Sequence, residues 1–264
     1  MNMRKEMAVI LSQTKIASGI YSMWIKTELA KEAGAGQFIA VYTKSDAMLL
    51  PRPISICEVD KAGGAIRIVY RIAGAGTAEF SGYTEGDTVS ILGILGNGYD
   101  IDGISGGGNP SEKALILGGG IGIPPMLELV KEWTAINREC YSVLGYRDEL
   151  FLDKEFEAYG SVYIATEDGS AGTKGNVLDA VRENHLRADV IFACGPMPML
   201  RAVKQYSEQE GIRAYISLEE RMACGVGACL GCVCKTTKKD SHSNVNNARI
   251  CTDGPVFLAE EVDI

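Results

Sequence analysis

The amino-acid sequence predicts a multi-domain protein: an N-terminal antiparallel β-barrel, then a parallel α/β domain, then a small cysteine-rich C-terminal segment. Short apolar runs punctuated by glycine and proline favour the barrel, alternating strand and helix patterns favour the α/β domain, and clustered cysteines mark the tail. At 264 residues the chain is long enough for two domains and an appendage. We expect these three parts to span residues 1–101, 112–218 and 219–264.

The first part has the pattern of an all-β domain. Its apolar runs are short and are separated by Gly, Pro and Asp at close spacing, as in an antiparallel barrel or sandwich. The expected strands include Met7–Leu11, Gly36–Tyr42, Ala65–Ile72 and Thr88–Leu95. The segment 102–110 has the composition of a linker and should end this domain.

The second part alternates between buried strands and helices, which predicts a parallel sheet covered by helices. The expected strands are Lys113–Leu117, Tyr141–Tyr146, Val162–Thr166 and Val190–Cys194. The expected helices are Pro124–Trp133, Val177–Arg187 and Met197–Glu210.

Composition and charge exclude several function classes. The formal net charge of −8 disfavours nucleic-acid binding, which needs a basic face. No segment reaches the roughly 18 apolar residues of a membrane span, and the charged start Met1–Glu6 is not followed by the apolar region of a secretory signal. We therefore expect a cytoplasmic protein, in which the eight cysteines serve as thiols, metal ligands or redox centres rather than disulfides.

Four cysteines in the tail have the spacing of an iron–sulfur site. Cys224, Cys229 and Cys232 form C-x4-C-x2-C, and Cys251 follows at a distance, which is the plant-type pattern for a [2Fe–2S] cluster. The small residues between them let the backbone approach a cluster closely. The alternatives are a zinc site and a group of buried thiols, and Cys234 could be a spare or an alternative ligand.

Two glycine-containing turns in the second part follow predicted strands and precede predicted helices. This is the arrangement that places a diphosphate at a helix N-terminus in an open parallel sheet. The candidate nucleotide-binding residues are Gly118, Gly119, Gly120, Gly122, Cys194, Gly195 and Pro196. The first turn departs from G-x-G-x-x-G, and both could be ordinary tight turns.

The barrel carries two short motifs suited to a phosphate. Arg52-Pro-Ile-Ser55 offers a cation and a hydroxyl on a stiff turn, and Gly74-Ala-Gly-Thr77 offers a small-residue turn with a hydroxyl. A nicotinamide transfers two electrons as a hydride, whereas an iron–sulfur cluster passes one. Flavin is the cofactor that exchanges pairs for single electrons, so both sites in one chain predict a flavin in the barrel.

Several motifs together resemble the ferredoxin–NADP reductase superfamily: Arg52-Pro-Ile-Ser-Ile56, the turn Gly118–Pro125 and Cys194-Gly-Pro-Met197. The cysteine cluster and Thr166–Gly175 are similar to one family within it, the electron-transfer subunits of B-type, NAD-dependent dihydroorotate dehydrogenase. The similarity covers nearly the whole chain. It implies a FAD-binding barrel, a NAD-binding α/β domain and a [2Fe–2S] tail.

The resemblance also implies residue roles. Ser55 would hydrogen-bond near the reactive flavin nitrogen, and Cys194 would lie near the nicotinamide, although a small buried residue at a strand end is an equal reading of Cys194. The cluster ligands carry over to Cys224, Cys229, Cys232 and Cys251, while the loop before Cys251 is longer than the family leads us to expect. The FAD contacts carry over to Arg52, Pro53, Ile54, Ser55, Val69, Tyr70, Arg71, Gly76 and Thr77.

The family's activity would make this chain one half of an enzyme. A separate FMN-containing catalytic subunit oxidises dihydroorotate in pyrimidine (UMP) biosynthesis, and its electrons pass through the cluster and FAD to NAD⁺ in a heterotetramer with two copies of each subunit. Arg147, Asp148 and Glu149 follow a predicted strand, and the two acidic residues favour NAD over NADP. With two histidines the chain shows no evident acid–base or nucleophilic constellation of its own.

Two other functions fit the same motifs. One is the small subunit of another NAD(P)H- or ferredoxin-linked oxidoreductase, of the sulfide dehydrogenase or transhydrogenase type. The other is a redox sensor that uses the cluster but needs no intact nicotinamide site. NADH-dependent dye reduction excludes the sensor, whereas the identity of the partner distinguishes the two enzymes.

Overall fold

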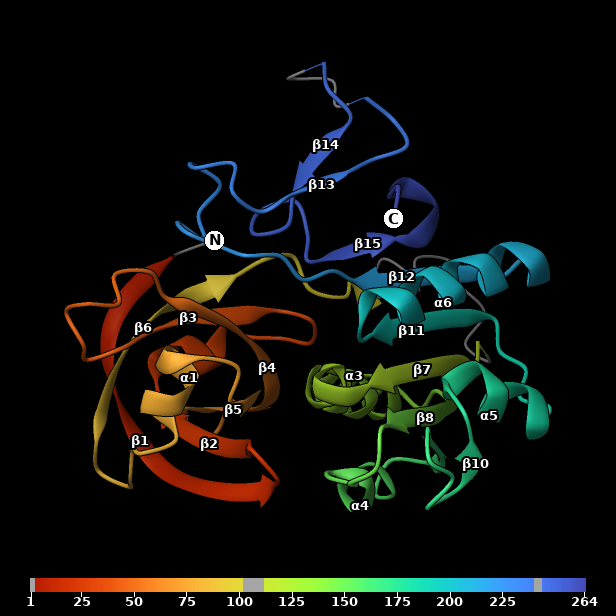
Figure 1. Ribbon diagram of the computed structural model, residues 1–264, viewed down its shortest axis with the longest axis horizontal. Helices are drawn as coiled ribbons and strands as arrows, with labels where there is room; N and C mark the ends of the chain where they lie inside the picture. The colour runs from red at the N-terminus through yellow and green to blue at the C-terminus, as the bar shows by residue number, and fades with distance from the viewer. Residues whose placement is uncertain (1–2, 102–111, 240–243) are drawn as a thin grey trace.

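The computed structural model describes residues 3–101, 112–239 and 244–264. A closed barrel and a seven-stranded sheet lie side by side, and the C-terminal tail lies across one end of both (Figure 1). This arrangement confirms the predicted fold class. The predicted linker 102–110 and part of the polar loop before Cys251, residues 240–243, lie outside the described residues.

The barrel closes in the strand order β1-β2-β5-β4-β3-β6, and every neighbouring pair is antiparallel. Alternation along β1 fills its interior, because Ala8 and Ile10 are buried while Met7, Val9 and Leu11 face out. The barrel elements are β1 Arg4–Ala17, β2 Ile20–Lys26, η1 Glu28–Lys31, β3 Phe38–Tyr42, β4 Arg52–Asp60, β5 Ala65–Arg71, α1 Ala75–Phe80 and β6 Thr88–Leu95.

Both barrel motifs differ from the predicted turns. Arg52–Ser55 is the beginning of β4, and Gly74–Thr77 leads into the short helix α1. A proline is tolerated in this strand because residues 52–55 pair with β3 alone, whereas the pairing with β5 begins at Ile56. The missing N–H of Pro53 therefore costs no ladder hydrogen bond on the β5 side.

The α/β domain is one sheet in the order β10-β9-β8-β7-β11-β12-β15, parallel except for β15. Helices α3 and α4 pack on one face, and α5 and α6 pack on the other. Across the described ranges, no helix has the length and apolar character to cross a membrane. The elements are β7 Ala114–Gly119, η2 Gly120–Gly122, α3 Pro124–Ala135, β8 Cys140–Tyr146, α4 Asp153–Phe156, β9 Ser161–Thr166, β10 Thr173–Lys174, α5 Val177–Glu183, β11 Val190–Cys194, α6 Met197–Glu210 and β12 Arg213–Ser217.

The tail is tied to both larger domains. Its strand β15 (Val256–Leu258) extends the α/β sheet by pairing with β12, and β13 (Val233–Lys235) pairs with β14 (Asn247–Arg249) to form a separate ribbon. The chain ends just after the short helix η3, Ala259–Glu261. On the barrel side, the Asn97 backbone N–H donates to the Gly254 carbonyl at 2.6 Å. The cysteine-rich segment is therefore held in a fixed place against the end of the barrel.

Buried polar contacts fix the barrel against the α/β domain. Arg67 of β5 forms a bidentate ion pair with Glu155 of α4. Its Nε also donates a hydrogen bond to Ser22 Oγ at 2.8 Å. The buried Glu128 of α3 accepts the backbone N–H of Val59 at 2.8 Å. The contacts of Glu155 and Glu128 both cross the boundary between the domains, and charge-assisted hydrogen bonds of this kind fix how the two domains are oriented.

Candidate functional site

Two predicted flavin residues meet at the end of the barrel. The Arg52 guanidinium lies over the α-carbon of Gly76, where an added Cβ would be 2.1 Å from Arg52 Nε. Arg52 also donates from Nη1 to the Leu50 carbonyl. Thr77 orders the turn, since its Oγ1 accepts the Ala73 N–H at 2.8 Å. A forked cation beside a small-residue turn is suited to binding a phosphate.

The side chains of the other predicted flavin-binding residues point in different directions. Tyr70 points into the barrel, where its hydroxyl donates to Gln13 Oε1 at 2.8 Å, so only its backbone is available to a ligand. Val69 instead packs into the apolar core shared with the α/β domain, and Arg71 is exposed at the strand end. Ser55 lies opposite Phe38 on the outer face of the barrel.

The two glycine turns of the α/β domain are packed directly against each other. Gly118 and Cys194 are paired across β7 and β11, so both turns leave the sheet at the carboxyl ends of adjacent strands. A Cβ on Gly122 would lie 2.4 Å from the Cys194 carbonyl oxygen, and one on Gly195 would lie 3.2 Å from the Gly119 nitrogen. This edge of an open α/β sheet is where nucleotides bind.

Cys194 is a neutral buried thiol at this edge. Burial raises its pKa above the ordinary range, the nearby Glu219 carboxylate raises it further, and a hydrogen bond with Ser217 opposes the shift. Glu219 itself has a raised pKa because protein surrounds its carboxyl, and Arg71 across the domain boundary opposes that shift. Cys194 is therefore a neutral, buried side chain beside Ser217 and Glu219 rather than a thiolate nucleophile.

Sequence reasoning missed two polar residues near Cys194. Glu219 follows the carboxyl end of β12, and the rule that strand ends line the ligand crevice could have singled it out. Tyr99 is buried with its ring edge-on to Phe192 at 5.3 Å, and its hydroxyl is the buried side-chain oxygen without a hydrogen-bond partner in the described chain. It lies close enough to Cys194 for the two groups to interact electrostatically.

The acidic residues after β8 have separate tasks. Glu149 accepts the backbone N–H of Ser18 on the barrel at 2.8 Å, so it joins the two domains. Asp148 pairs with the exposed Arg147 at 3.2 Å. This ion pair offsets the positive charge of Arg147, which would otherwise favour the 2′-phosphate of NADP. The Ser170 hydroxyl lies 3.4 Å from the Asp148 carbonyl and connects this loop to the one after β9.

The four predicted cluster ligands are arranged as two pairs. Cys224 contacts Cys229, and Cys232 contacts Cys251 through their sulfur atoms. Cys232 and Cys251 are both 2% exposed, whereas Cys229 is exposed. Within the described ranges, no three His, Cys, Asp or Glu side chains are arranged around a single metal ion. Two cysteine pairs match the ligand set that a two-iron cluster would need.

Backbone N–H groups point at these sulfurs, as an anionic cluster requires. Gly227 donates to Cys251 Sγ at 3.2 Å, and Val226 donates to Cys224 Sγ at 3.4 Å. Burial opposes ionisation of Cys224, but hydrogen bonds from the backbone N–H groups of Val226 and Cys229, together with smaller contributions from the Cys229 thiol and the Ala228 N–H, outweigh it and lower its pKa to about 7. Gly227 has a φ of +80°, so a residue with a side chain would be strained there. The residues present fit a [2Fe–2S] group.

The other cysteines are not members of these two pairs. Cys57 and Cys140 are buried and belong to the core cluster shared by the barrel and the α/β domain. Cys234 lies opposite Ala248 in the β13–β14 ribbon, and burial raises its pKa. None of the eight cysteines forms a disulfide.

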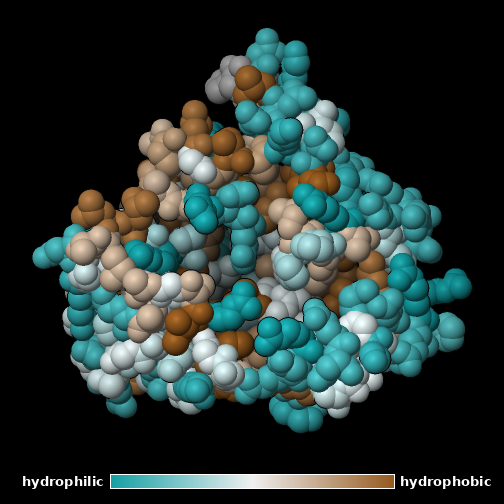
Figure 2. Space-filling view, viewed as in Figure 1, coloured by the Kyte–Doolittle hydropathy of each residue, from teal (hydrophilic) through white to brown (hydrophobic). Residues whose placement is uncertain are grey.

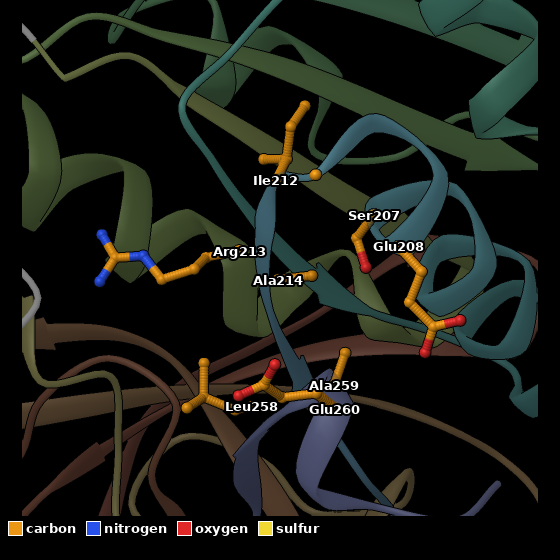
Figure 3. A pocket seen from close by; sticks show the side chains of 9 residues that line it. Ser207, Glu208, Ile212, Arg213, Ala214, Leu258, Ala259 and Glu260 are labelled. Carbon is orange, nitrogen blue, oxygen red and sulfur yellow. The ribbon is translucent and has the colours of Figure 1, made fainter.

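A cavity of about 290 Å³ lies elsewhere, between the end of α6, β12 and the tail (Figure 3). No predicted site residue lines it, and the polar groups that converge at the strand ends are outside it. We therefore locate the chemistry at the strand ends. The cavity is lined by Ser207, Glu208, Gly211, Ile212, Arg213, Ala214, Leu258, Ala259 and Glu260.

Two family models match the chain in agreement with this geometry. Residues 219–263 match the iron-sulfur cluster binding domain of dihydroorotate dehydrogenase B. Residues 116–205 match the oxidoreductase NAD-binding domain. These ranges contain the four paired cysteines and the two packed turns, respectively.

Similarity to two bacterial proteins extends over nearly the full length of the chain. The chain is 42% identical to the dihydroorotate dehydrogenase B (NAD(+)) electron transfer subunit of Bacillus velezensis, over 98% of this chain and 99% of that one. It is 43% identical to the same subunit from Listeria monocytogenes, over 99% and 100% of the two chains. The chain belongs to this family. As a family member it is an electron-transfer subunit and an oxidoreductase component, which confirms the resemblance to this family.

Solved structures show the same architecture. A chain of the NADH-dependent reduced ferredoxin-NADP oxidoreductase superposes with a TM-score of 0.85 and 28% identity, over 97% of this chain and 89% of that one. A ferredoxin NADP⁺ reductase from Neisseria gonorrhoeae with bound FAD and NADP gives a TM-score of 0.66 at 15% identity, over 82% and 94% of the two chains. The second likeness shows the fold alone.

Proposed function

We propose that this chain conducts electrons from a separate FMN-containing dihydroorotate dehydrogenase subunit to NAD⁺, through a [2Fe–2S] cluster and FAD. The observation that carries the proposal is the paired arrangement of Cys224, Cys229, Cys232 and Cys251, with the first pair nearer the surface and the second pair buried. A surface pair suits entry of single electrons from a partner. A buried pair suits their delivery into the chain.

We propose the other residue roles from the contacts within the barrel and the α/β domain. Arg52 and the Gly76–Thr77 turn hold the FAD diphosphate, while Ser55 and the backbone of Val69–Arg71 lie along the flavin. The flavin supplies the exchange between single electrons and a hydride. The packed turns Gly118–Gly122 and Cys194–Pro196 bind NAD and bring its nicotinamide to the domain boundary, where Cys194 excludes water.

The preference for NAD over NADP rests on the loop after β8. Asp148 neutralises Arg147, and Glu149 is committed to the barrel, so this loop offers no unpaired cation to a 2′-phosphate. We propose the cytoplasm as the location, because cysteines that serve as metal ligands rather than as disulfides are typical of a reducing compartment.

The partner's docking face is the surface around the exposed cysteine pair. Apolar side chains gather on the part of the surface where the tail meets the barrel (Figure 2). Val226, Leu230 and Val233 are 36%, 61% and 38% exposed, respectively, and flank the cysteines in sequence. An apolar rim lets a partner exclude water while its electron donor comes close to Cys229. We propose a heterotetramer with two copies of each subunit.

An anaerobic titration of the purified chain tests the cofactor set. Iron, acid-labile sulfide and FAD should be present at two, two and one per chain, as expected for one [2Fe–2S] and one flavin. NADH should bleach the flavin absorbance and produce the electron paramagnetic resonance signal of a reduced two-iron cluster. A chain that carries a cluster but leaves NADH unoxidised would instead be the redox sensor considered above.

One observation favours the alternative function, a subunit of another NAD(P)H- or ferredoxin-linked oxidoreductase. The structure with a TM-score of 0.85 comes from an NADH-dependent reduced ferredoxin-NADP oxidoreductase, so the same architecture serves another electron-transfer system. The chain shares 28% identity with that protein and 42% with the dihydroorotate dehydrogenase subunit. The higher identity favours dihydroorotate as the electron source.

A further inference from the structure

The flavin-binding strand and the cluster are joined through a particular part of the barrel wall. Ser55 of β4 lies opposite Phe38 of β3. The neighbouring Ile56 donates its N–H to the Gln37 carbonyl at 2.9 Å, so the Phe38–Ser55 pair is of the non-hydrogen-bonded class, in which opposed side chains are closest. Phe38 therefore lies directly beside the position assigned to the flavin.

The next strand carries this contact to the cysteine segment. Phe38 also pairs with Leu95 of β6. The Leu95 side chain reaches the backbone beside the first cluster ligand, because a Cβ on Gly225 would lie 3.3 Å from Leu95 Cδ1. A Cβ on Gly96 would lie 2.8 Å from the Phe38 ring, so the backbone after Leu95 packs on the same ring.

These two side chains belong to the interior of the cluster region rather than to that of the barrel. Phe38 and Leu95 are 4% and 1% exposed, and they share one apolar core with the buried ligands Cys232 and Cys251. The next residue along β3, Ile39, points the opposite way into the barrel core. The path from Ser55 to the cysteines is thus filled by two apolar side chains in contact, with water excluded.

We propose that Phe38 and Leu95 form the bridge through which single electrons pass between the cluster and the flavin. The inference rests on the proposed function and adds the route inside the chain. Electronic coupling between two redox centres is stronger across side chains in van der Waals contact than across a gap, and a void in this wall removes those contacts. In each transfer one electron is removed from the cluster and added to the flavin. Two transfers and one proton from solvent supply the hydride accepted by NAD⁺.

The test uses the purified chain with its FAD and cluster and follows the reverse direction from NADH. Stopped-flow absorbance measures hydride transfer to the flavin, and rapid-freeze electron paramagnetic resonance measures the later reduction of the cluster. Leu95→Ala opens the bridge, and Leu95→Met keeps its volume. The matched control is Leu29→Ala, the same substitution at a fully buried leucine in the barrel core.

We expect Leu95→Ala to slow cluster reduction several-fold while hydride transfer and both reduction potentials stay at wild-type values. Leu95→Met should restore the rate, and Leu29→Ala should leave it unchanged. An unaltered rate in Leu95→Ala, or an equal slowing in Leu29→Ala, would overturn the bridge. A wild-type chain in which NADH reduces neither flavin nor cluster would instead overturn the proposed function, and the bridge with it.

Discussion

The α-carbon of Gly122 lies against the carbonyl group of Cys194, so closely that a single methyl group would come within 2.4 Å of the oxygen. This contact joins the turn after β7 to the turn after β11 and sets the width of the candidate nicotinamide site. The backbone atoms involved cannot move away as a flexible side chain could. Glycine is therefore required at this position for steric reasons.

Gly122→Ala should separate the two turns and weaken NADH binding. Overpacking against the backbone costs about 1–3 kcal/mol, which we expect to appear as a raised KM for NADH and slower flavin reduction. FAD and iron content should stay unchanged, because the atoms nearest the added methyl group belong to Cys194 and Gly195 and not to Arg52 or the four candidate cluster ligands. Gly82→Ala is the control, since its nearest atom would be at an ordinary contact distance of 3.4 Å. Steady-state kinetics with a dye acceptor provides the measurement.

Arg52→Ala should release FAD. A charge-assisted hydrogen bond to phosphate contributes about 1.5–3 kcal/mol, so we expect roughly ten- to hundredfold weaker binding by equilibrium dialysis. Gly76→Ala should weaken binding through the same guanidinium, because the added methyl group would displace it. Gly74→Ala has open space around its α-carbon and should retain FAD. Full retention of FAD in Arg52→Ala would contradict the assigned site.

Single Cys→Ser substitutions should separate the cluster ligands from the other cysteines. We expect Cys224→Ser, Cys229→Ser, Cys232→Ser and Cys251→Ser to lose the [2Fe–2S] signal, because a paired thiolate is removed in each case. Cys234→Ser should keep it, since Cys234 is packed in the β13–β14 ribbon. Iron analysis and electron paramagnetic resonance check both expectations. A cluster lost in Cys234→Ser but kept in Cys251→Ser would reverse the ligand assignment.

Glu132→Gln should make the chain more stable at neutral pH. Burial raises the pKa of Glu132 above its model-compound value of 4.5, and the nearby Glu128 raises it further. The folded form thus binds the proton more tightly than the unfolded form, so this group's contribution to stability falls as pH rises from 4.5 through the raised pKa. Glutamine keeps an oxygen for the Ala35 N–H that Glu132 accepts at 3.2 Å. Thermal unfolding at pH 4 to 8 should show a gain that grows with pH, whereas a pH-independent change would contradict this origin.

Leu230→Asp should weaken association with the catalytic subunit. A carboxylate placed in the apolar rim beside Cys229 would be buried without a partner in the complex, and we expect about tenfold or greater loss of affinity. FAD and cluster content should be unaffected, because the side chain is 61% exposed in the free chain. Ile136→Asp, at an exposed leucine-sized residue after α3, is the matched control. Analytical ultracentrifugation of the reconstituted pair would reveal either outcome.

The sequence predicted the local elements of the α/β domain well, because their patterns are self-contained. The strand Val190–Cys194 and the helix Met197–Glu210 have the predicted bounds. The strand is a short continuous apolar run that ends at a glycine, and the helix lies between a proline and a glycine. The strand β4 was missed because a proline at its second residue indicated a turn. The pairing that makes Pro53 acceptable is a long-range feature that no local pattern contains.

The parts of the candidate site that depend on the spacing of residues along the chain could be predicted. The parts that depend on contacts between distant segments could not. Cysteine spacing predicted four ligands, and the structure brings these cysteines together as two pairs. Three other features join segments that are far apart in the sequence. They are the contact of Gly76 with Arg52, the placement of Glu219 beside Cys194 and the pairing of Phe38 with Leu95. The domain bounds at 101, 112 and 218, the roles of individual site residues and the subunit stoichiometry remain predictions.

The central claim concerns the source of the electrons, and isolation of the chain from its native host tests it most directly. We predict that it purifies with an equal number of FMN-containing subunits. Anaerobic dihydroorotate should then bleach the flavins, produce the reduced [2Fe–2S] signal and, after NAD⁺ is added, form NADH. A different redox partner, or a complex that dihydroorotate leaves oxidised, would contradict the account.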